Sequence, residues 1–133
     1  MTKELLAKLF STDSDLLSKY HILAPNSAEV CAERTFKDLQ DSKVVVHLIE
    51  QNGEVIGYYG IEGTAFLTGF FLTPENRTSS MIELFWRRVE KHFDKDYFVG
   101  LYTKNTRAID FMNKKTTEKY ETKNDVVLFK VRR

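Results

Sequence analysis

Apolar residues recur at two different spacings along the chain, and the spacing changes near residue 43. In residues 1–42 they recur every three or four positions, which is the pattern of amphipathic helices. We expect a first helix capped by Thr2 and a second that begins at Asp13 or Ser14. After a break at 24–26, Ser27 is expected to cap a third helix.

From residue 43 onward the pattern changes to that of strands and turns. Runs of β-branched and aromatic residues predict three consecutive antiparallel strands. The Asn52-Gly53 pair between the first two strands is a strong signal for a type I′ hairpin turn. The expected strands cover residues 44–49, 55–61 and 64–72.

The third strand is followed by a polar turn and an amphipathic helix. Pro74 has no N–H to donate and should end the strand. Thr78, Ser79 and Ser80 are all competent N-cap residues, and Ser80 with Glu83 fits a capping box. The helix that follows carries a wide apolar stripe made of Ile82, Phe85, Trp86, Val89 and Phe93.

The remaining residues predict a fourth strand, a helix and a final hairpin. The strand covers 96–102, the helix follows a cap at Asn105, and the hairpin strands cover 118–122 and 126–131. Because a helix connects the third strand to the fourth, these two strands should be parallel neighbours. Parallel neighbours can splay apart and open a slot for a ligand.

These elements predict one α+β domain over residues 1–133. Residues 1–42 would form its helical N-terminal part. Residues 43–133 would form a mixed, mostly antiparallel sheet and the two main helices. The hydrophobic content of 42% and the charged content of 29% are those of a soluble globular protein.

Charge and hydropathy narrow the choice of partners and compartment. The net charge of +1 gives no electrostatic reason to expect nucleic acid or a membrane surface as the main partner. No apolar run approaches the roughly 20 residues of a spanning helix, and the N-terminus lacks a signal peptide's apolar region. We therefore expect a cytoplasmic protein, or one packaged into a particle assembled in the cytoplasm.

Cysteine and histidine usage predicts neither a disulfide nor a metal site. Cys31 is the single cysteine, and its apolar neighbours favour a small core residue over a reactive thiolate. The three histidines, His21, His47 and His92, show no metal-ligand spacing.

The turn between the third strand and its helix has two interpretations. Free N–H groups at a helix N-terminus, together with the helix dipole, can bind an anion, and Arg77 could add a charged fork. The same residues also fit an ordinary, well-capped connection. On this stretch alone the second interpretation is favoured, because caps are more common than anion sites.

Two stretches, together with the order of the elements, resemble the GNAT superfamily of N-acyltransferases. In that family a turn of pattern (Q/R)xxGx(G/A) follows the meander, and Arg77 falls on its first position. The stretch from Asn105 to Phe111 is similar to the family's NxxAxxF pattern. The resemblance covers about residues 43–133, and it implies helices on both faces of the sheet and a splayed parallel strand pair.

The resemblance also implies acetyl-CoA as the cofactor. Backbone groups of residues 70–72 would bind the pantetheine arm, the turn from Arg77 would hold the pyrophosphate, and Asn105 would lie near the thioester. The cofactor-binding residues expected on this basis are Phe70, Phe71, Leu72, Arg77, Thr78, Ser79, Ser80, Met81 and Asn105.

Several positions depart from the family pattern. Ser80 and Ile82 stand where the motif has Gly and Gly or Ala, and a β-branched side chain adds bulk where phosphates should approach the backbone. Met112 stands where many members have a Tyr that acts as the acid and protonates the leaving thiolate. Residues 116–117 are Thr-Thr, where the family usually has Gly-Phe. Small GNAT-like proteins of tailed bacteriophages depart similarly, and the chain resembles them.

The resemblance leaves two functions open. The first is transfer of an acetyl group from acetyl-CoA to a small-molecule or protein amine. Glu62 or His47 would be the base, Tyr102 would be the acid, and a backbone N–H near Phe71 would stabilise the oxyanion. Each of these residues also fits an ordinary strand position. The second function is a non-catalytic binding or virion-assembly module of a bacteriophage, with a second copy of the chain or a virion protein as partner.

Overall fold

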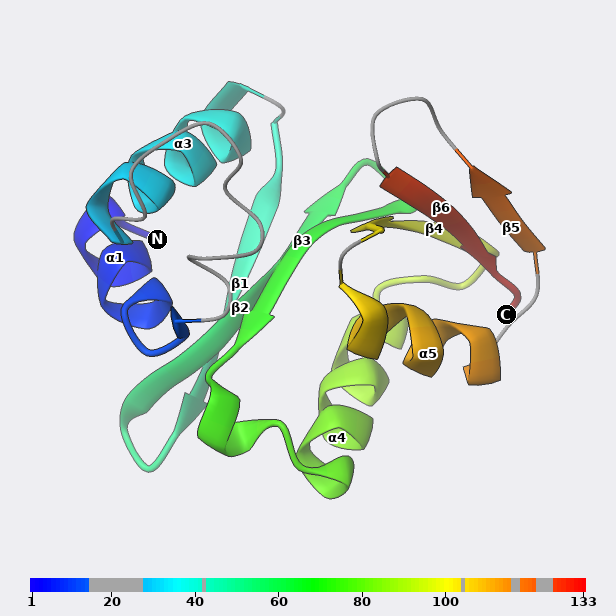
Figure 1. The fold of residues 1–133 in the computed structure, drawn as a ribbon. Helices are drawn as coiled ribbons and strands as arrows, with labels where there is room; N and C mark the ends of the chain where they lie inside the picture. Colours follow the sequence, from blue (N-terminus) through cyan, green and yellow to red (C-terminus); the bar gives the residue numbers. More distant parts are fainter. Residues whose placement is uncertain (15–27, 42, 104, 116–117, 122–125) are drawn as a thin grey trace.

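The computed structural model describes residues 1–14, 28–41, 43–103, 105–115, 118–121 and 126–133. Within this part of the chain one six-stranded sheet has the strand order β1-β2-β3-β4-β6-β5 (Figure 1). The strands are β1 Val45–Gln51, β2 Glu54–Glu62, β3 Phe66–Leu72, β4 Tyr97–Tyr102, β5 Glu118–Glu121 and β6 Val126–Val131. The predicted mixed, mostly antiparallel sheet is confirmed, since only the β3–β4 pair is parallel among these neighbours.

Helices cover both faces of the sheet (Figure 1). On one face α1 Lys3–Phe10 and α3 Ala28–Asp41 pack against β1 to β3, and their core includes Leu6, Cys31 and Phe71. On the other face lie α4 Ser79–Glu90 and α5 Thr106–Lys115, whose core includes Trp86, Val89 and Met112. The fold is therefore α+β, as the sequence predicted.

The parallel strands β3 and β4 are paired only at their first residues. Phe66 faces Phe98 and Leu67 faces Val99, and no further pair follows. Beyond this point β3 continues beside β2 as far as Leu72, whereas β4 continues beside β6 as far as Tyr102. The sheet therefore opens between the C-terminal halves of β3 and β4, as expected for a splayed pair.

Several local signals act as the sequence predicted. The Asn52-Gly53 turn has positive φ at both positions, 54° and 80°, which is the type I′ geometry. The Thr2 hydroxyl caps α1 by accepting a hydrogen bond from the Leu5 N–H at 3.1 Å. The Asn105 side chain caps α5 by accepting one from the Ala108 N–H at 3.3 Å.

The predicted capping box of Ser80 and Glu83 is wrong. Thr78 is the N-cap of α4, with extended backbone angles and a side chain that accepts from the Met81 N–H at 3.3 Å. Ser80 already lies in the helix, and an N-cap residue must have non-helical angles. Strand β3 also begins at Phe66 instead of residue 64. The body of the second expected helix, the Ser27 cap and the turn at 123–125 lie outside the described residues.

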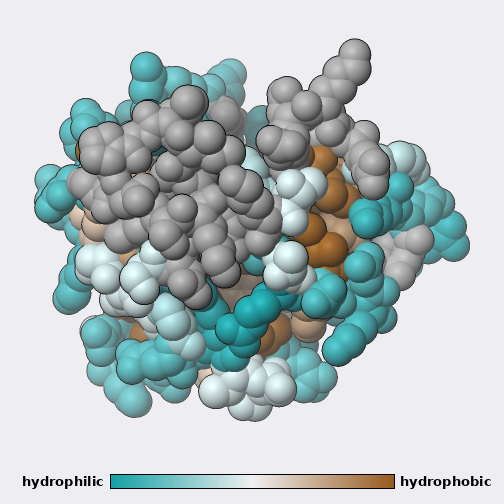
Figure 2. Space-filling model, viewed as in Figure 1, coloured by the Kyte–Doolittle hydropathy of each residue, from teal (hydrophilic) through white to brown (hydrophobic). Residues whose placement is uncertain are grey.

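The surface carries a few exposed apolar side chains. Figure 2 shows that the face seen in Figure 1 is mostly hydrophilic, with an apolar area to the right of centre. Among the described residues the large exposed apolar side chains are Val45, Phe66, Leu84, Tyr102 and Tyr120. No described helix has both the length and the apolar character needed to cross a membrane.

Candidate functional site

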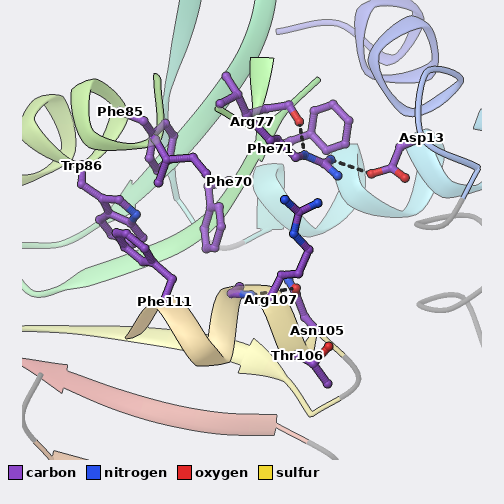
Figure 3. A pocket seen from close by; sticks show the side chains of 13 residues that line it. Asp13, Phe70, Phe71, Arg77, Phe85, Trp86, Asn105, Thr106, Arg107 and Phe111 are labelled. Carbon is purple, nitrogen blue, oxygen red and sulfur yellow. Dashed lines mark hydrogen bonds and ion pairs between the residues drawn. The ribbon is translucent and has the colours of Figure 1, made fainter. Parts of the chain in front are cut away.

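A cavity of about 260 Å³ lies between the end of β3 and the starts of α4 and α5. Figure 3 shows its lining side chains, which converge from segments far apart in the sequence. The cavity opens where β3 and β4 part, so the slot predicted from the parallel pair is present. Its lining residues are Asp13, Phe70, Phe71, Leu72, Arg77, Ile82, Phe85, Trp86, Asn105, Thr106, Arg107, Ala108 and Phe111.

Aromatic rings form one wall of the cavity. The ring of Trp86 stacks on Phe111 at a centroid distance of 5.5 Å, and Phe70 meets Trp86 at 5.9 Å. Phe85 lies edge-on to Trp86 at 5.4 Å. Because each ring is fixed by its neighbours, the wall is preformed and offers an apolar surface to a flexible ligand chain.

The free edge of β3 supplies backbone groups on the opposite side. The Thr73 N–H donates to the Ile56 carbonyl of β2 at 2.9 Å. Backbone groups alternate in direction along an antiparallel ladder, so those of Phe71 also face β2, whereas those of Phe70 and Leu72 face the opening. The N–H groups available to a ligand are therefore those of Phe70 and Leu72, which lie on either side of Phe71, the residue near which the sequence suggested an oxyanion-binding N–H.

Arg77 lies beside the cavity but is already engaged. Its Nε donates to the Leu72 carbonyl at 2.7 Å, and its Nη2 lies 2.5 Å from Oδ2 of Asp13. Its guanidinium also lies over the Phe71 ring, 5.2 Å from the centroid. Asp13 is only 5% exposed, so this is a largely buried ion pair. From the sequence Asp13 was expected only to start a helix, because no local pattern links it to a residue 64 positions away.

The turn at the start of α4 contributes less to the lining than expected. Of its first residues only Ile82 lines the cavity, whereas Thr78, Ser79, Ser80 and Met81 do not. The Met81 N–H is taken by the Thr78 hydroxyl. The N–H groups of residues 78–80 donate to no group in the described part of the chain, and they lie at the N-terminal end of α4, four to two residues before the cavity-lining Ile82.

The start of α5 forms the remaining side of the cavity. Asn105 lines it, although its side-chain oxygen is occupied in capping Ala108. Arg107 lines it as well and has an exposed side chain. Figure 3 shows the Arg107 side chain extending from α5 toward Phe71 and Arg77. Sequence analysis did not single out Arg107, because an arginine in a helix is ordinarily a solvated residue.

The three candidate acids and bases lie away from this lining. Tyr102 ends β4 with 57% of its surface exposed. Glu62 faces Phe66, at the end of β3 opposite to the cavity, and accepts from the Thr68 hydroxyl at 3.3 Å. His47 lies on β1. These positions do not test the catalytic roles of Tyr102, Glu62 and His47, and each role stays a prediction.

His47 belongs to a separate cluster with Tyr59 and His92. Its ring stacks on Tyr59 at 5.0 Å and lies 4.4 Å from the ring of His92. The Tyr59 hydroxyl is hydrogen-bonded to Nε2 of His92 at 2.8 Å. Burial, followed by the charge of His92, lowers the pKa of His47. No group of three or more His, Cys, Asp or Glu residues among those described is arranged to hold a metal.

The sequence matches no protein-family model and no curated protein. Solved structures do match. An acetyltransferase from Thermus thermophilus has a TM-score of 0.71 at 14% identity, covering 98% of this chain and 89% of that one. A GCN5-related N-acetyltransferase from Rhodopseudomonas palustris has a TM-score of 0.63 at 11% identity, covering 98% and 89%. The chain has the GNAT fold.

A third match bears on ligands. PaiA N-acetyltransferase from Thermoplasma acidophilum, in complex with coenzyme A, has a TM-score of 0.67 at 13% identity, covering 98% of this chain and 92% of that one. The GNAT fold predicted from two short stretches is thus confirmed. All three proteins come from cellular organisms, so the resemblance to small phage proteins stays a prediction.

Proposed function

We propose that this protein is an N-acetyltransferase that binds acetyl-CoA in the cavity between β3, α4 and α5. The observation that carries the proposal is the parting of β3 and β4 beside a preformed cavity with one aromatic wall. It is supported by the GNAT fold and by the acetyltransferases that share it.

The residues present fit the cofactor in most respects. Phe70, Trp86 and Phe111 offer an apolar surface for the pantetheine arm, and the outward-facing N–H groups of Phe70 and Leu72 are free to donate to it. The N–H groups of residues 78–80, at the N-terminus of α4 that supplies the cavity-lining Ile82, would be available to a pyrophosphate. When bound, acetyl-CoA supplies a thioester whose acetyl group can pass to an amine.

The chain's own groups would act by positioning and by hydrogen bonding. The cavity walls would hold the thioester at the β3 edge and exclude water from it. A backbone N–H of Phe70 or Leu72 can donate to the carbonyl oxygen as negative charge develops there. Tyr102 and Glu62 remain the proposed acid and base. Neither lines the cavity, so each would exchange its proton with the reacting atoms through a chain of bound water molecules.

A second candidate function is a non-catalytic binding module, including the virion-assembly role implied by the phage resemblance. Two observations favour it. Ile82 lines the cavity where the family motif has Gly or Ala, and Asp13 places a carboxylate beside Arg77. Both features hinder the binding of a pyrophosphate, because the Ile82 side chain takes up space and the Asp13 carboxylate repels the negative phosphates.

Titration with coenzyme A and acetyl-CoA tests the proposal directly. Trp86 is the single tryptophan and lines the cavity, so its fluorescence should change on binding. Calorimetry would give the affinity, and release of free thiol from acetyl-CoA with a panel of amines would report transfer. Binding with transfer to any amine supports the enzyme. Binding without transfer to any amine supports the cofactor site but not the transfer reaction. No binding at millimolar ligand rejects the proposal and leaves the binding module.

Leu84→Ala is a matched control for these measurements. Leu84 lies on the same helix as Trp86 but is 51% exposed and does not line the cavity. Its truncation should leave binding and the fluorescence change as they are in the wild type. Tyr102→Phe and Glu62→Gln then test the two proposed catalytic groups. Each substitution should lower the transfer rate without changing the affinity for coenzyme A.

A further inference from the structure

The cavity is lined by two guanidinium groups that differ in what they already contact. Arg77 is bound to a carboxylate and to a backbone carbonyl. Arg107 makes no hydrogen bond or ion pair with any part of the chain that the structure describes, and its side chain is exposed. The two side chains approach each other across the cavity (Figure 3).

The pairing of Arg77 limits what it can offer to an anion. Its charge is balanced by Asp13, so an incoming phosphate meets a neutral pair whose carboxylate repels it. Arg77 keeps N–H groups that these two contacts do not use, but it offers its full charge to a phosphate only if its ion pair with Asp13, which is 5% exposed, is broken. Breaking a buried ion pair is unfavourable.

Arg107 can bind a phosphate without breaking an ion pair in the described part of the chain. Its planar fork of N–H donors matches phosphate oxygens, and its exposed side chain gives up only water on binding. It lies in the first turn of α5 beside Asn105, on the same cavity as the aromatic wall. A ligand whose apolar arm lies against Phe70 and Trp86 can therefore place a phosphate within its reach.

On the basis of the proposed function, we infer that Arg107 is the residue that recognises the cofactor's phosphate groups. Asp13 keeps Arg77 as part of the fold, so the cation that the sequence motif suggested is replaced by one from α5. Asp13 also weakens the binding of the cofactor's phosphate groups, because its carboxylate lies in the cavity lining and repels them.

Four variants with two ligands test this assignment by calorimetry. Coenzyme A carries phosphate groups, whereas pantetheine has the same arm without them. Arg107→Gln should weaken coenzyme A binding about 10- to 100-fold, the range for a charged hydrogen bond, and leave pantetheine binding unchanged. Arg87→Gln, which removes an exposed arginine of α4 outside the cavity lining, should change neither.

The other two variants address the pair. Arg77→Gln combined with Asp13→Asn removes both charges of the neutral pair, so this double variant should lower the melting temperature but change coenzyme A affinity by less than about twofold. Asp13→Asn alone leaves the charge of Arg77 unbalanced, so it should tighten coenzyme A binding and leave pantetheine binding unchanged. Arg77→Lys, which keeps the charge of the pair, is the substitute if the double variant does not fold.

The outcomes separate this inference from the proposed function. If Arg107→Gln binds coenzyme A as tightly as the wild type, Arg107 is not the phosphate-binding residue and the inference is overturned. The same holds if the folded double variant of Arg77→Gln with Asp13→Asn loses as much affinity as Arg107→Gln. A wild type that binds neither ligand overturns the proposed function itself, and this inference with it.

Discussion

The carboxylate of Asp13 and the guanidinium of Arg77 form an ion pair across 64 positions of the chain. The pair links the residues after α1 to the turn that joins β3 and α4. Arg77 also binds the end of β3 through the Leu72 carbonyl. The N-terminal helix and the cavity are therefore coupled, and changes at Asp13 should affect both stability and ligand binding.

Asp13→Ala should destabilise the protein. The substitution leaves Arg77 without its carboxylate in a site where the two side chains are 28% and 7% exposed. A hydrogen bond between charged groups contributes about 1.5–3 kcal/mol, and we expect a loss near the lower end because Arg77 is partly solvated. Urea denaturation followed by Trp86 fluorescence would measure it.

The Arg132–Glu118 pair is the control for this prediction. Its side chains are 66% and 39% exposed, so solvent screens their attraction. Glu118→Ala should shift the urea midpoint much less than Asp13→Ala does. Equal shifts for the two variants would show that the Asp13–Arg77 pair contributes no more than an ordinary surface pair.

Trp86→Ala should be among the more destabilising single substitutions. Trp86 is 5% exposed and lies between Phe85, Phe70 and Phe111. Truncating a large buried aromatic residue costs about 3–5 kcal/mol, whereas exposed Leu84→Ala should stay within about 0.5 kcal/mol of the wild type. Circular dichroism against urea would measure both, and an unchanged midpoint for Trp86→Ala would contradict the burial of this ring.

The histidine cluster predicts a pH-dependent stability. Burial and His92 lower the pKa of His47 below its ordinary value of 6.5, so the unfolded chain binds the proton more readily than the folded one. The stabilisation from neutral His47 is thus complete above about pH 6.5 and is lost as the pH falls toward the pKa in the folded protein. The groups that face His47 are the stacked ring of Tyr59 and the ring of His92. The Tyr59 hydroxyl is bonded to His92, and the positive charge of Arg88 lies near Tyr59.

Urea midpoints between pH 8 and pH 5.5 would measure this dependence. In His47→Gln the fall in stability on acidification should be smaller than in the wild type, because one group that gains a proton on unfolding is gone. The comparison concerns how steeply the urea midpoint changes with pH, so a loss of stability that is the same at every pH does not affect it. Parallel slopes in the two proteins would rule out His47 as the source.

Sequence alone predicted the elements that depend on local chemistry. The Asn52-Gly53 turn and the Thr2 and Asn105 caps depend on residues a few positions apart, and all have the expected geometry. At the start of α4 three adjacent hydroxyl residues could each serve as the N-cap, and their side-chain chemistry alone did not identify Thr78 as the cap. The outcome depends on where β3 ends and how the turn packs.

The site was less predictable because it depends on contacts between distant segments. Phe70, Leu72 and Asn105 line the cavity, since strand order and splaying place them there, and the cofactor contacts that the resemblance implied for them stay predictions. The Asp13 contact to Arg77 depends on how α1 packs against the sheet, which no pattern encodes. The distance of Glu62 from the cavity depends on the β2–β3 register, in which Glu62 pairs with Phe66.

Replacing Ser80 and Ile82 together by Gly and Ala restores the family pattern of the turn and tests whether its bulk matters. Ile82 is half-buried, so its truncation should cost about 1–2 kcal/mol, below the range for a fully buried residue. Ser80 lies inside α4 and is not its cap, so glycine there should cost about 0.5 kcal/mol through helix propensity. Urea denaturation would verify that the double variant is folded.

The affinity of this double variant for coenzyme A distinguishes the two functions. If the protein is an acetyltransferase, the wild type already binds measurably, and the variant binds at least as tightly because Ile82 no longer narrows the cavity beside the phosphates. If the protein is a binding module, the wild type shows no binding at millimolar coenzyme A, and only the variant can gain some. Absence of binding in both proteins, each shown to be folded, would leave the GNAT fold without acyltransferase chemistry, because neither the bulk of Ile82 nor the loss of glycine would then account for the failure.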